Sequence, residues 1–183
     1  MAETHRIEIE GVQRELPLVQ VAPGVRIALL NILGDVEFVA ACVQGLAAKL
    51  SDKNYDVLVT AEAKSIPLIH MLAEQVNKPY VVLRKTYKPY MGTAIEAETV
   101  SITTGEAQTL YLDEKDHSLV SGKRVALLDD VISTGSTQRA MKAVMEIAQA
   151  EIAVEAAIFT EGDQAEWAHI ISLGHLPLFV DKK

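Results

Sequence analysis

Residues 123–139 read Lys-Arg-Val-Ala-Leu-Leu-Asp-Asp-Val-Ile-Ser-Thr-Gly-Ser-Thr-Gln-Arg, and this stretch decides the fold. Its apolar run, 125–128, is bounded by charges, as expected of a parallel strand that is buried on both faces. The run ends in two adjacent carboxylates, Asp129 and Asp130, which therefore lie at the carboxyl edge of the predicted sheet. Ligands of open α/β sheets bind in the crevice at that edge. The sequence thus predicts a binding site beside the two acids.

The residues after the acids suit a bound phosphate group. Small side chains, hydroxyl donors and one glycine let backbone N–H groups approach an anion before a helix begins; these residues are Ser133, Thr134, Gly135, Ser136 and Thr137. An apolar stripe predicts the helix itself, at Ala140, Met141, Val144, Met145 and Ala148. Two carboxylates would repel a neighbouring phosphate unless they had another task. Holding ribose hydroxyls, directly or with a metal ion, resolves that conflict.

The same stretch resembles a family signature. Residues 127–137 are similar to the phosphoribosyl-pyrophosphate signature of type I phosphoribosyltransferases, in which hydrophobic residues and two acids precede Thr-Gly-x-Thr. The sequence excludes the P-loop of nucleoside triphosphatases and the glycine-rich loop of dinucleotide-binding folds, because it contains neither G-x-x-x-x-G-K-[ST] nor G-x-G-x-x-G. A polar turn with a chance cluster of hydroxyl groups is the remaining structural alternative.

Composition bounds the size of the protein and its partners. With 183 residues, 49% of them hydrophobic, the chain has the length of one well-packed domain, which we expect to span residues 1–183. The formal net charge of −8 argues against a nucleic acid or a membrane surface as the partner. A single cysteine, Cys42, cannot form an intrachain disulfide, and the sequence shows neither a signal-peptide pattern nor a long apolar window. We therefore expect a cytoplasmic protein.

The rest of the chain alternates strand and helix patterns. Residues 1–34 predict short strands and turns, and residues 35–50 predict a helix that Asp35 caps. Further strands are predicted at 55–60, 80–84 and 154–159, a helix at 66–76, and an antiparallel hairpin at 99–103 and 108–112. This order predicts an α/β fold with a twisted, mainly parallel sheet flanked by helices.

Two further segments carry the cations that an anionic ligand requires. Lys64 lies in a loop between a predicted strand and helix, where its charge and the helix dipole would both favour an anion. That loop resembles the family's pyrophosphate loop, which implies contacts from Ala63, Lys64 and Ser65, although the family commonly has glycine in place of Ser65. Arg84 and Lys88 begin a basic and aromatic segment, and the resemblance implies that both face pyrophosphate. For these cations, exposure to solvent or pairing with surface carboxylates is the alternative interpretation.

The resemblance also implies an architecture and a mechanism. It implies a small hood, from about residues 1–34 and 160–183, and a flexible β-hairpin lid at about 85–112. It further implies a homodimer and catalysis with Mg²⁺ of transfer from phosphoribosyl pyrophosphate. In this scheme Asp129 and Asp130 bind ribose and the metal, through water or the sugar, and Asp130 lies near the positive charge that develops at C1.

The resemblance implies that the acceptor is a purine base, with adenine as the first candidate. The Pro-Gly-Val segment at residues 23–25 and the chain length are most similar to the adenine phosphoribosyltransferases. Those enzymes commonly have Glu-Tyr-Gly in the lid, where this chain has Thr-Thr-Gly, and Glu106 follows as a candidate group for proton transfer. The alternatives are the same chemistry on a 6-oxopurine such as xanthine, and a regulator that binds phosphoribosyl pyrophosphate without turnover.

Overall fold

The computed structural model describes residues 3–100 and 107–181, and its centre is a parallel five-stranded sheet. The strand order is β10-β9-β8-β4-β5, and every neighbouring pair is parallel. The strands span Val57–Ala61 (β4), Tyr80–Leu83 (β5), Arg124–Ile132 (β8), Glu151–Glu161 (β9) and Ile171–Leu176 (β10). The expected α/β fold with a parallel sheet is confirmed.

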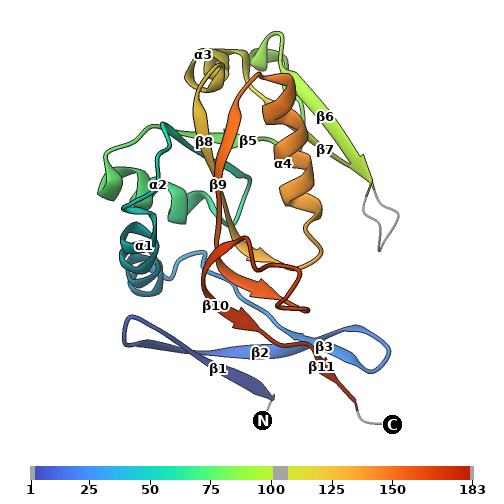
Figure 1. The fold of residues 1–183 in the computed structure, drawn as a ribbon. Coiled ribbons are helices and arrows are strands. Elements are labelled where there is room, and N and C mark those ends of the chain that lie inside the picture. Colours follow the sequence, from blue (N-terminus) through green and yellow to red (C-terminus); the bar gives the residue numbers. More distant parts are fainter. Residues whose placement is uncertain (1–2, 101–106, 182–183) are drawn as a thin grey trace.

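Helices cover both faces of this sheet (Figure 1). On one face lie α1 (Val36–Leu50) and α2 (Ile66–Val76); on the other lies α4 (Ser136–Ile147), against which the hairpin of β6 (Ile95–Val100) and β7 (Ala107–Leu112) packs. Short helical turns occupy Pro89–Met91 (η1), Glu114–Asp116 (η2) and His117–Val120 (α3). Along β8, Val125 and Leu127 pack toward α4 and Ala126 and Leu128 toward α1 and α2, which confirms a strand buried on both faces. No helix within the described residues is long and apolar enough to cross a membrane.

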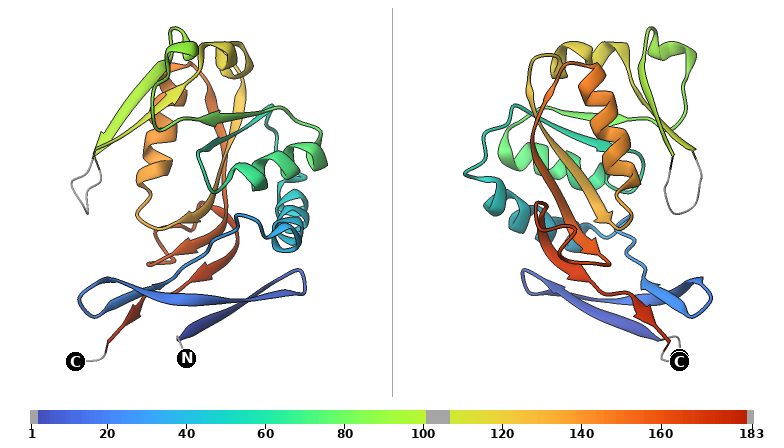
Figure 2. Two further views of the ribbon diagram at one scale, coloured as in Figure 1. Left: turned by 180° about the vertical axis from the view of Figure 1, so that it is seen from behind. Right: turned by 45° about the vertical axis from the view of Figure 1, so that its right-hand side comes forward.

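The two ends of the chain meet in a second sheet, which we call the hood sheet. It has the strand order β1-β2-β3-β11, with β1 at Thr4–Ile9, β2 at Val12–Ala22, β3 at Val25–Ala28 and β11 at Phe179–Val180. The views in Figures 1 and 2 show it beyond the carboxyl end of β8. Within residues 160–181, β11 belongs to the hood sheet, whereas β10 pairs with β9 in the central sheet.

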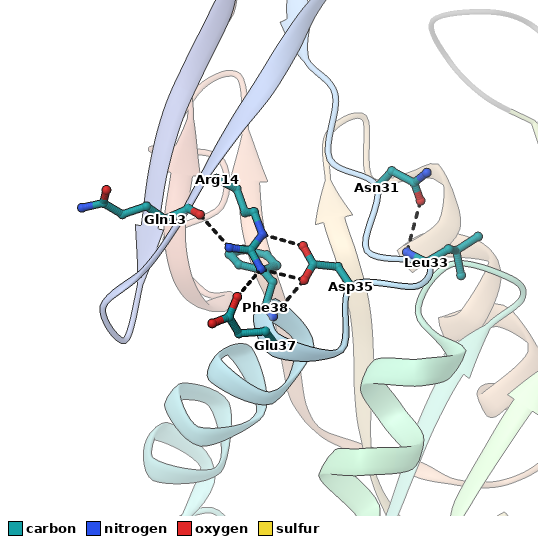
Figure 3. A network of polar contacts seen from close by, with 7 residues as sticks. All are labelled: Gln13, Arg14, Asn31, Leu33, Asp35, Glu37 and Phe38. Atoms are coloured by element: carbon teal, nitrogen blue, oxygen red, sulfur yellow. Dashed lines mark hydrogen bonds and ion pairs between the residues drawn. The ribbon is translucent and has the colours of Figure 1, made fainter.

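A network of charged groups fastens the hood sheet to α1 (Figure 3). From β2, Arg14 donates to both oxygens of Asp35, at 2.6 and 2.8 Å, and to Glu37 at 2.8 Å. Asp35 also accepts from the backbone N–H of Phe38 at 3.1 Å, so it caps α1 as predicted. The Arg14 guanidinium lies 5.8 Å from the centre of the Phe38 ring. One arginine therefore joins the hood sheet, the helix cap and the core.

This network should make stability depend on pH. The hydrogen bonds from Arg14 lower the pKa of Asp35 from its ordinary 3.8, against the opposing effect of burial. A carboxyl group whose pKa is lowered by folding stabilises the protein above its ordinary pKa, and that contribution is lost as the pH falls through the folded pKa. We expect Asp35→Asn to lower the free energy of unfolding by about 1 kcal/mol at neutral pH, and by progressively less below about pH 4.

Urea unfolding of both proteins across this pH range measures the effect. A matched control is Asp52→Asn, because Asp52 pairs with Lys53 on the exposed surface, where we expect a change below about 0.5 kcal/mol. A difference between wild type and Asp35→Asn that stayed constant with pH would contradict this account.

The hairpin begins earlier than the sequence indicated. The first strand was expected at residues 99–103, whereas β6 runs over Ile95–Val100 and pairs with β7 from Ile95↔Leu112 to Val100↔Ala107. Ile95 and Ala97 pack inward opposite Leu112 and Leu110, while Glu96 and Glu98 are exposed. The sequence pattern did not indicate that this segment belongs to the strand, because Glu, present at residues 96 and 98, is uncommon in strands. Residues 101–106 lie outside the described part of the chain.

Candidate active site

The two acids lie where β8 leaves one of its neighbours. β8 pairs with β4 only from Val125 to Leu127, whereas it pairs with β9 as far as Ile132. The last link to β4 is the Thr60 hydroxyl, which donates to the carbonyl of Leu128 at 2.6 Å. The sequence predicted that this strand ends at residue 128. That prediction was wrong for β8, which continues to Ile132, although the contacts of β8 with β4 do end at Leu128. Beyond Leu128, the residues of β8 lie beside the loop of residues 62–65, which follows β4.

Side chains from that loop contact both acids. The Ser65 hydroxyl lies 3.1 Å from Oδ1 of Asp129 and 3.4 Å from Oδ1 of Asp130, and Ser65 is only 1% exposed. Lys64 Nζ lies 2.8 Å from Oδ2 of Asp130 and 3.4 Å from the carbonyl of Leu30. Ala63 accepts from the N–H of Ile66, which turns the chain into α2. The loop and the acids predicted from separate motifs thus form one cluster.

The carboxylate of Asp129 is held in an unfavourable electrostatic environment. Burial, followed by the neighbouring Asp130, raises the pKa of Asp129 well above its ordinary value, although the Ser65 hydroxyl and the backbone N–H of Asp130 act in the opposite direction. Asp130 is 6% exposed and meets the ammonium of Lys64. An additional cation, or sugar hydroxyls that donate to the acids, would relieve this repulsion.

The two other predicted cations lie outside this cluster. Arg84 Nε donates to Oε2 of Glu62 at 2.6 Å, so it contacts the start of the Lys64 loop through an acid. The N–H of Lys85 donates to the other oxygen of Glu62, also at 2.6 Å. Together these bonds overcome the effect of burial and lower the pKa of Glu62. The exposed Lys88 makes no hydrogen bond or ion pair with the described residues of the cluster.

The hydroxyl-rich loop after β8 borders an open cavity of about 150 Å³. The cavity is lined by Asp129 and by the residues from Val131 to Gln138, including all five predicted phosphate-loop residues. Gly135 is the N-cap of α4 with φ +69°, and the Thr134 hydroxyl lies 3.2 Å from that of Ser136. Arg139 reaches back and donates to the carbonyl of Thr134 at 3.0 Å. The first N–H groups of a helix have no partner within the helix, so this loop offers donors to an anion.

The indole of Trp167 packs against the hydroxyl-rich loop at Gly135. A β-carbon on residue 135 would lie 2.8 Å from Cη2 of Trp167, so the indole leaves room only for glycine there. The indole is held by its own N–H, which donates to the carbonyl of Glu161 at 2.9 Å, and it packs with Ile132 and Ile170. The sequence did not predict that Trp167 packs against Gly135 or that the Ser65 hydroxyl contacts both acids. Both contacts depend on the order of the strands in the sheet. Glu106 lies outside the described residues.

A family model and several relatives match this chain. The model described as "Phosphoribosyl transferase domain" covers residues 32–170. The purine biosynthesis transcriptional repressor PurR of Bacillus subtilis is 28% identical over 134 residues, which are 73% of this chain and 46% of the repressor. The adenine phosphoribosyltransferase of Thermosipho africanus is 32% identical over 123 residues, 66% of this chain and 68% of that protein. The hypoxanthine/guanine phosphoribosyltransferase of Methanococcus voltae is 36% identical over 112 residues, 61% of this chain and 56% of that protein. The chain thus spans about half to two thirds of the length of these relatives.

Solved structures bear out the fold. The crystal structure of adenine phosphoribosyltransferase from Thermoanaerobacter pseudethanolicus superposes with a TM-score of 0.68 at 20% sequence identity, and the match covers 94% of this chain and 95% of that one. At this identity the likeness concerns the fold alone. The family model covers most of the chain and includes the two acids, the Lys64 loop and the hydroxyl-rich loop. The chain therefore belongs to the phosphoribosyl transferase domain family and has the type I phosphoribosyltransferase fold.

Proposed function

We propose that this protein transfers the 5-phosphoribosyl group from phosphoribosyl pyrophosphate to a purine base and releases pyrophosphate. One observation carries the proposal: two acids, a lysine 2.8 Å from one of them and a donor-rich cavity at a helix N-terminus share one edge of the sheet. Ribose hydroxyls, pyrophosphate and a sugar phosphate require these three kinds of group. The names of the relatives, two phosphoribosyltransferases among them, support the same chemistry.

In the proposed reaction a ring nitrogen of the base bonds to C1 of the ribose as the bond from C1 to pyrophosphate breaks. The nitrogen then loses its proton, for which Glu106 remains our candidate acceptor. Lys64, with the backbone of Ala63 and Ser65, would neutralise the leaving pyrophosphate; Arg84 and Lys88 would join after Arg84 leaves Glu62. Asp129 and Asp130 would orient the ribose, with Asp130 closest to the positive charge at C1.

A magnesium ion fits the acids and would bind mainly to the substrate. Mg²⁺ retains several waters and usually takes one or two carboxylates together with phosphate oxygens. Burial and the neighbouring Asp130 raise the pKa of Asp129, which supports the proposal of a cation beside the two acids. Among the described residues no group of three or more His, Cys, Asp or Glu forms a dedicated metal site. When bound, the metal would supply positive charge to the leaving pyrophosphate.

We propose adenine as the acceptor, on the Pro-Gly-Val segment at residues 23–25 and on the relative named as an adenine phosphoribosyltransferase, which is 32% identical over 123 residues. A 6-oxopurine such as xanthine is the first alternative, because a relative named for hypoxanthine and guanine is 36% identical over 112 residues. The second alternative is a regulator that binds phosphoribosyl pyrophosphate without turnover, because a relative of this chain is a transcriptional repressor.

A pyrophosphate-release assay, together with titration calorimetry of phosphoribosyl pyrophosphate, separates these functions. The protein is incubated with phosphoribosyl pyrophosphate, Mg²⁺ and, in turn, adenine, hypoxanthine, guanine, xanthine or orotate while pyrophosphate release is followed. We expect release with one purine, adenine first. Binding of phosphoribosyl pyrophosphate without release on any base would support the regulator, and absence of binding would refute the proposed function.

We propose one domain over residues 1–183, a homodimer and a cytoplasmic location; sedimentation velocity would test the dimer. The network of Arg14, Asp35 and Glu37 would then hold the hood sheet in place over the base.

A further inference from the structure

Gln138 is a buried amide without a partner. The residue is 3% exposed, and neither its Oε1 nor its Nε2 forms a hydrogen bond with any described residue. Buried polar groups are nearly always hydrogen-bonded, so an orphaned amide in a folded protein calls for an explanation such as a bound ligand. The rest of the buried face of α4 is apolar, with Met141, Val144 and Met145, which makes an amide at this position more unusual.

The position of Gln138 in the helix allows its side chain to reach the hydroxyl-rich loop. Gly135 is the N-cap of α4, so Gln138 is the third helical residue. Side chains on a helix lean toward its N-terminus, and at this third position a glutamine can reach back over the first turn. Gln138 lines the same 150 Å³ cavity as Asp129 and the hydroxyl-rich loop.

The groups around this cavity call for a ligand rich in acceptors. The second and third N–H groups of α4 and the hydroxyls of Ser133 and Thr137 are available as donors, whereas the Thr134 hydroxyl already donates to that of Ser136. Asp129 is the one carboxylate among the lining residues. A phosphate group supplies acceptors to the donors, and a sugar hydroxyl supplies a donor to the carboxylate. A sugar phosphomonoester therefore fits better than either a bare anion or a neutral molecule.

We propose that Gln138 is a ligand-binding residue whose side-chain amide donates through Nε2 to the phosphate of a sugar phosphomonoester seated in this cavity. The inference rests on the proposed function and extends it, because it adds a side-chain donor to a loop that would otherwise bind phosphate through its backbone and hydroxyls. A hydrogen bond to a charged group is among the stronger ones in proteins, so its loss should be measurable.

Ribose 5-phosphate is the probe, and titration calorimetry on the full chain is the measurement. Gln138→Met keeps the length of the side chain and removes the amide. We expect it to weaken ribose 5-phosphate binding roughly ten- to a hundredfold. The melting temperature of the ligand-free variant should be equal to or above that of the wild type, because the orphaned amide is gone. Gln138→Glu should weaken binding further, since its carboxylate would repel the phosphate.

Thr99→Val is the matched control. The Thr99 hydroxyl on β6 is also buried without a partner among the described residues, so its removal should likewise leave the fold intact, but with the affinity unchanged. If the wild type binds ribose 5-phosphate and both Gln138 variants bind it equally well, the inference alone is overturned. If the wild type itself does not bind, the proposed function fails with it.

Discussion

Replacing both acids, Asp129→Asn and Asp130→Asn, should lower the rate of pyrophosphate release by roughly 10²–10³-fold or more. The two substitutions keep the size of the side chains and remove both negative charges. The ribose then loses the acceptors that orient it, and the positive charge at C1 develops without a nearby anion. Lys64, 2.8 Å from Asp130 in the wild type, loses its partner as well.

The loss should not come from unfolding. Burial and the adjacent Asp130 raise the pKa of Asp129, so the folded state holds its proton more tightly than the unfolded state does. A pKa raised in this way makes an acid cost stability as the pH rises above its ordinary value of 3.8, up to the folded pKa. The double variant lacks that cost. We therefore expect its melting temperature at about pH 8, without metal, to equal or exceed that of the wild type.

The control for this experiment is an acid at the opposite edge of the same sheet. Asp56 precedes β4 and accepts from the N–H of Arg124 at 2.9 Å, far along β8 from the site. Asp56→Asn should leave the kinetics unchanged. Kinetic constants measured for phosphoribosyl pyrophosphate and for the base decide the matter: unaltered values in the double variant would show that the acids do not hold the sugar.

The sequence predicted the parts of the site whose contacts are local. Strand β8, the hydroxyl-rich loop and α4 follow one another directly, so hydrophobic periodicity and turn residues were sufficient to place them. The helix cap at Asp35 is local in the same sense, because the carboxylate accepts from an N–H three residues away. The lysine loop was placed correctly at the carboxyl edge, because parallel strands end at one edge.

Contacts between distant segments could not be predicted in this way. The bridge from Ser65 to the acids needs β4 beside β8, and the support of the loop by Trp167 needs the chain after β9 to return to it. Strand β10 was missed because its residues, Ile-Ser-Leu-Gly-His-Leu, include a glycine and a histidine and show no clear alternation. Its Gly174 lies directly against Phe159, where a β-carbon would be 2.7 Å from the ring. The glycine that makes this segment look less like a strand in the sequence is therefore required by its packing against Phe159.

The lysine-acid pair also constrains how the ligand enters. Lys64 is held by Asp130 and the carbonyl of Leu30, so only one of the three N–H donors of its ammonium group is left for a pyrophosphate oxygen. Arg84 is likewise held by Glu62. Because both cations are already paired with acids, a pyrophosphate group in the proposed reaction would compete with Asp130 and Glu62 for them, whereas the donors of the hydroxyl-rich loop face an open cavity. Binding of the sugar phosphate before the pyrophosphate contacts form is the order that this arrangement favours.

Gly135→Ala should weaken binding of ribose 5-phosphate about a hundredfold, because a displacement of roughly 1 Å can cost that much in a preorganised site. Two effects add at this position. The backbone has φ +69°, a left-handed conformation that costs roughly 1–2 kcal/mol for residues other than glycine. The new β-carbon would also lie 2.8 Å from the rigid indole of Trp167 and 3.2 Å from Nη1 of Arg139. The loop must therefore move away from its cavity or displace the indole.

Gly122→Ala separates these two effects. Gly122 has nearly the same φ, +67°, but a β-carbon there would meet no atom within 4 Å. It lies just before β8, at the other end of the strand from the hydroxyl-rich loop. We expect this control to lower the free energy of unfolding by about 1 kcal/mol and to leave the affinity for ribose 5-phosphate unchanged. Calorimetric titration and urea unfolding of both variants make the comparison. Equal affinities in the two would mean that close packing of Trp167 against Gly135 does not hold the loop in its binding conformation.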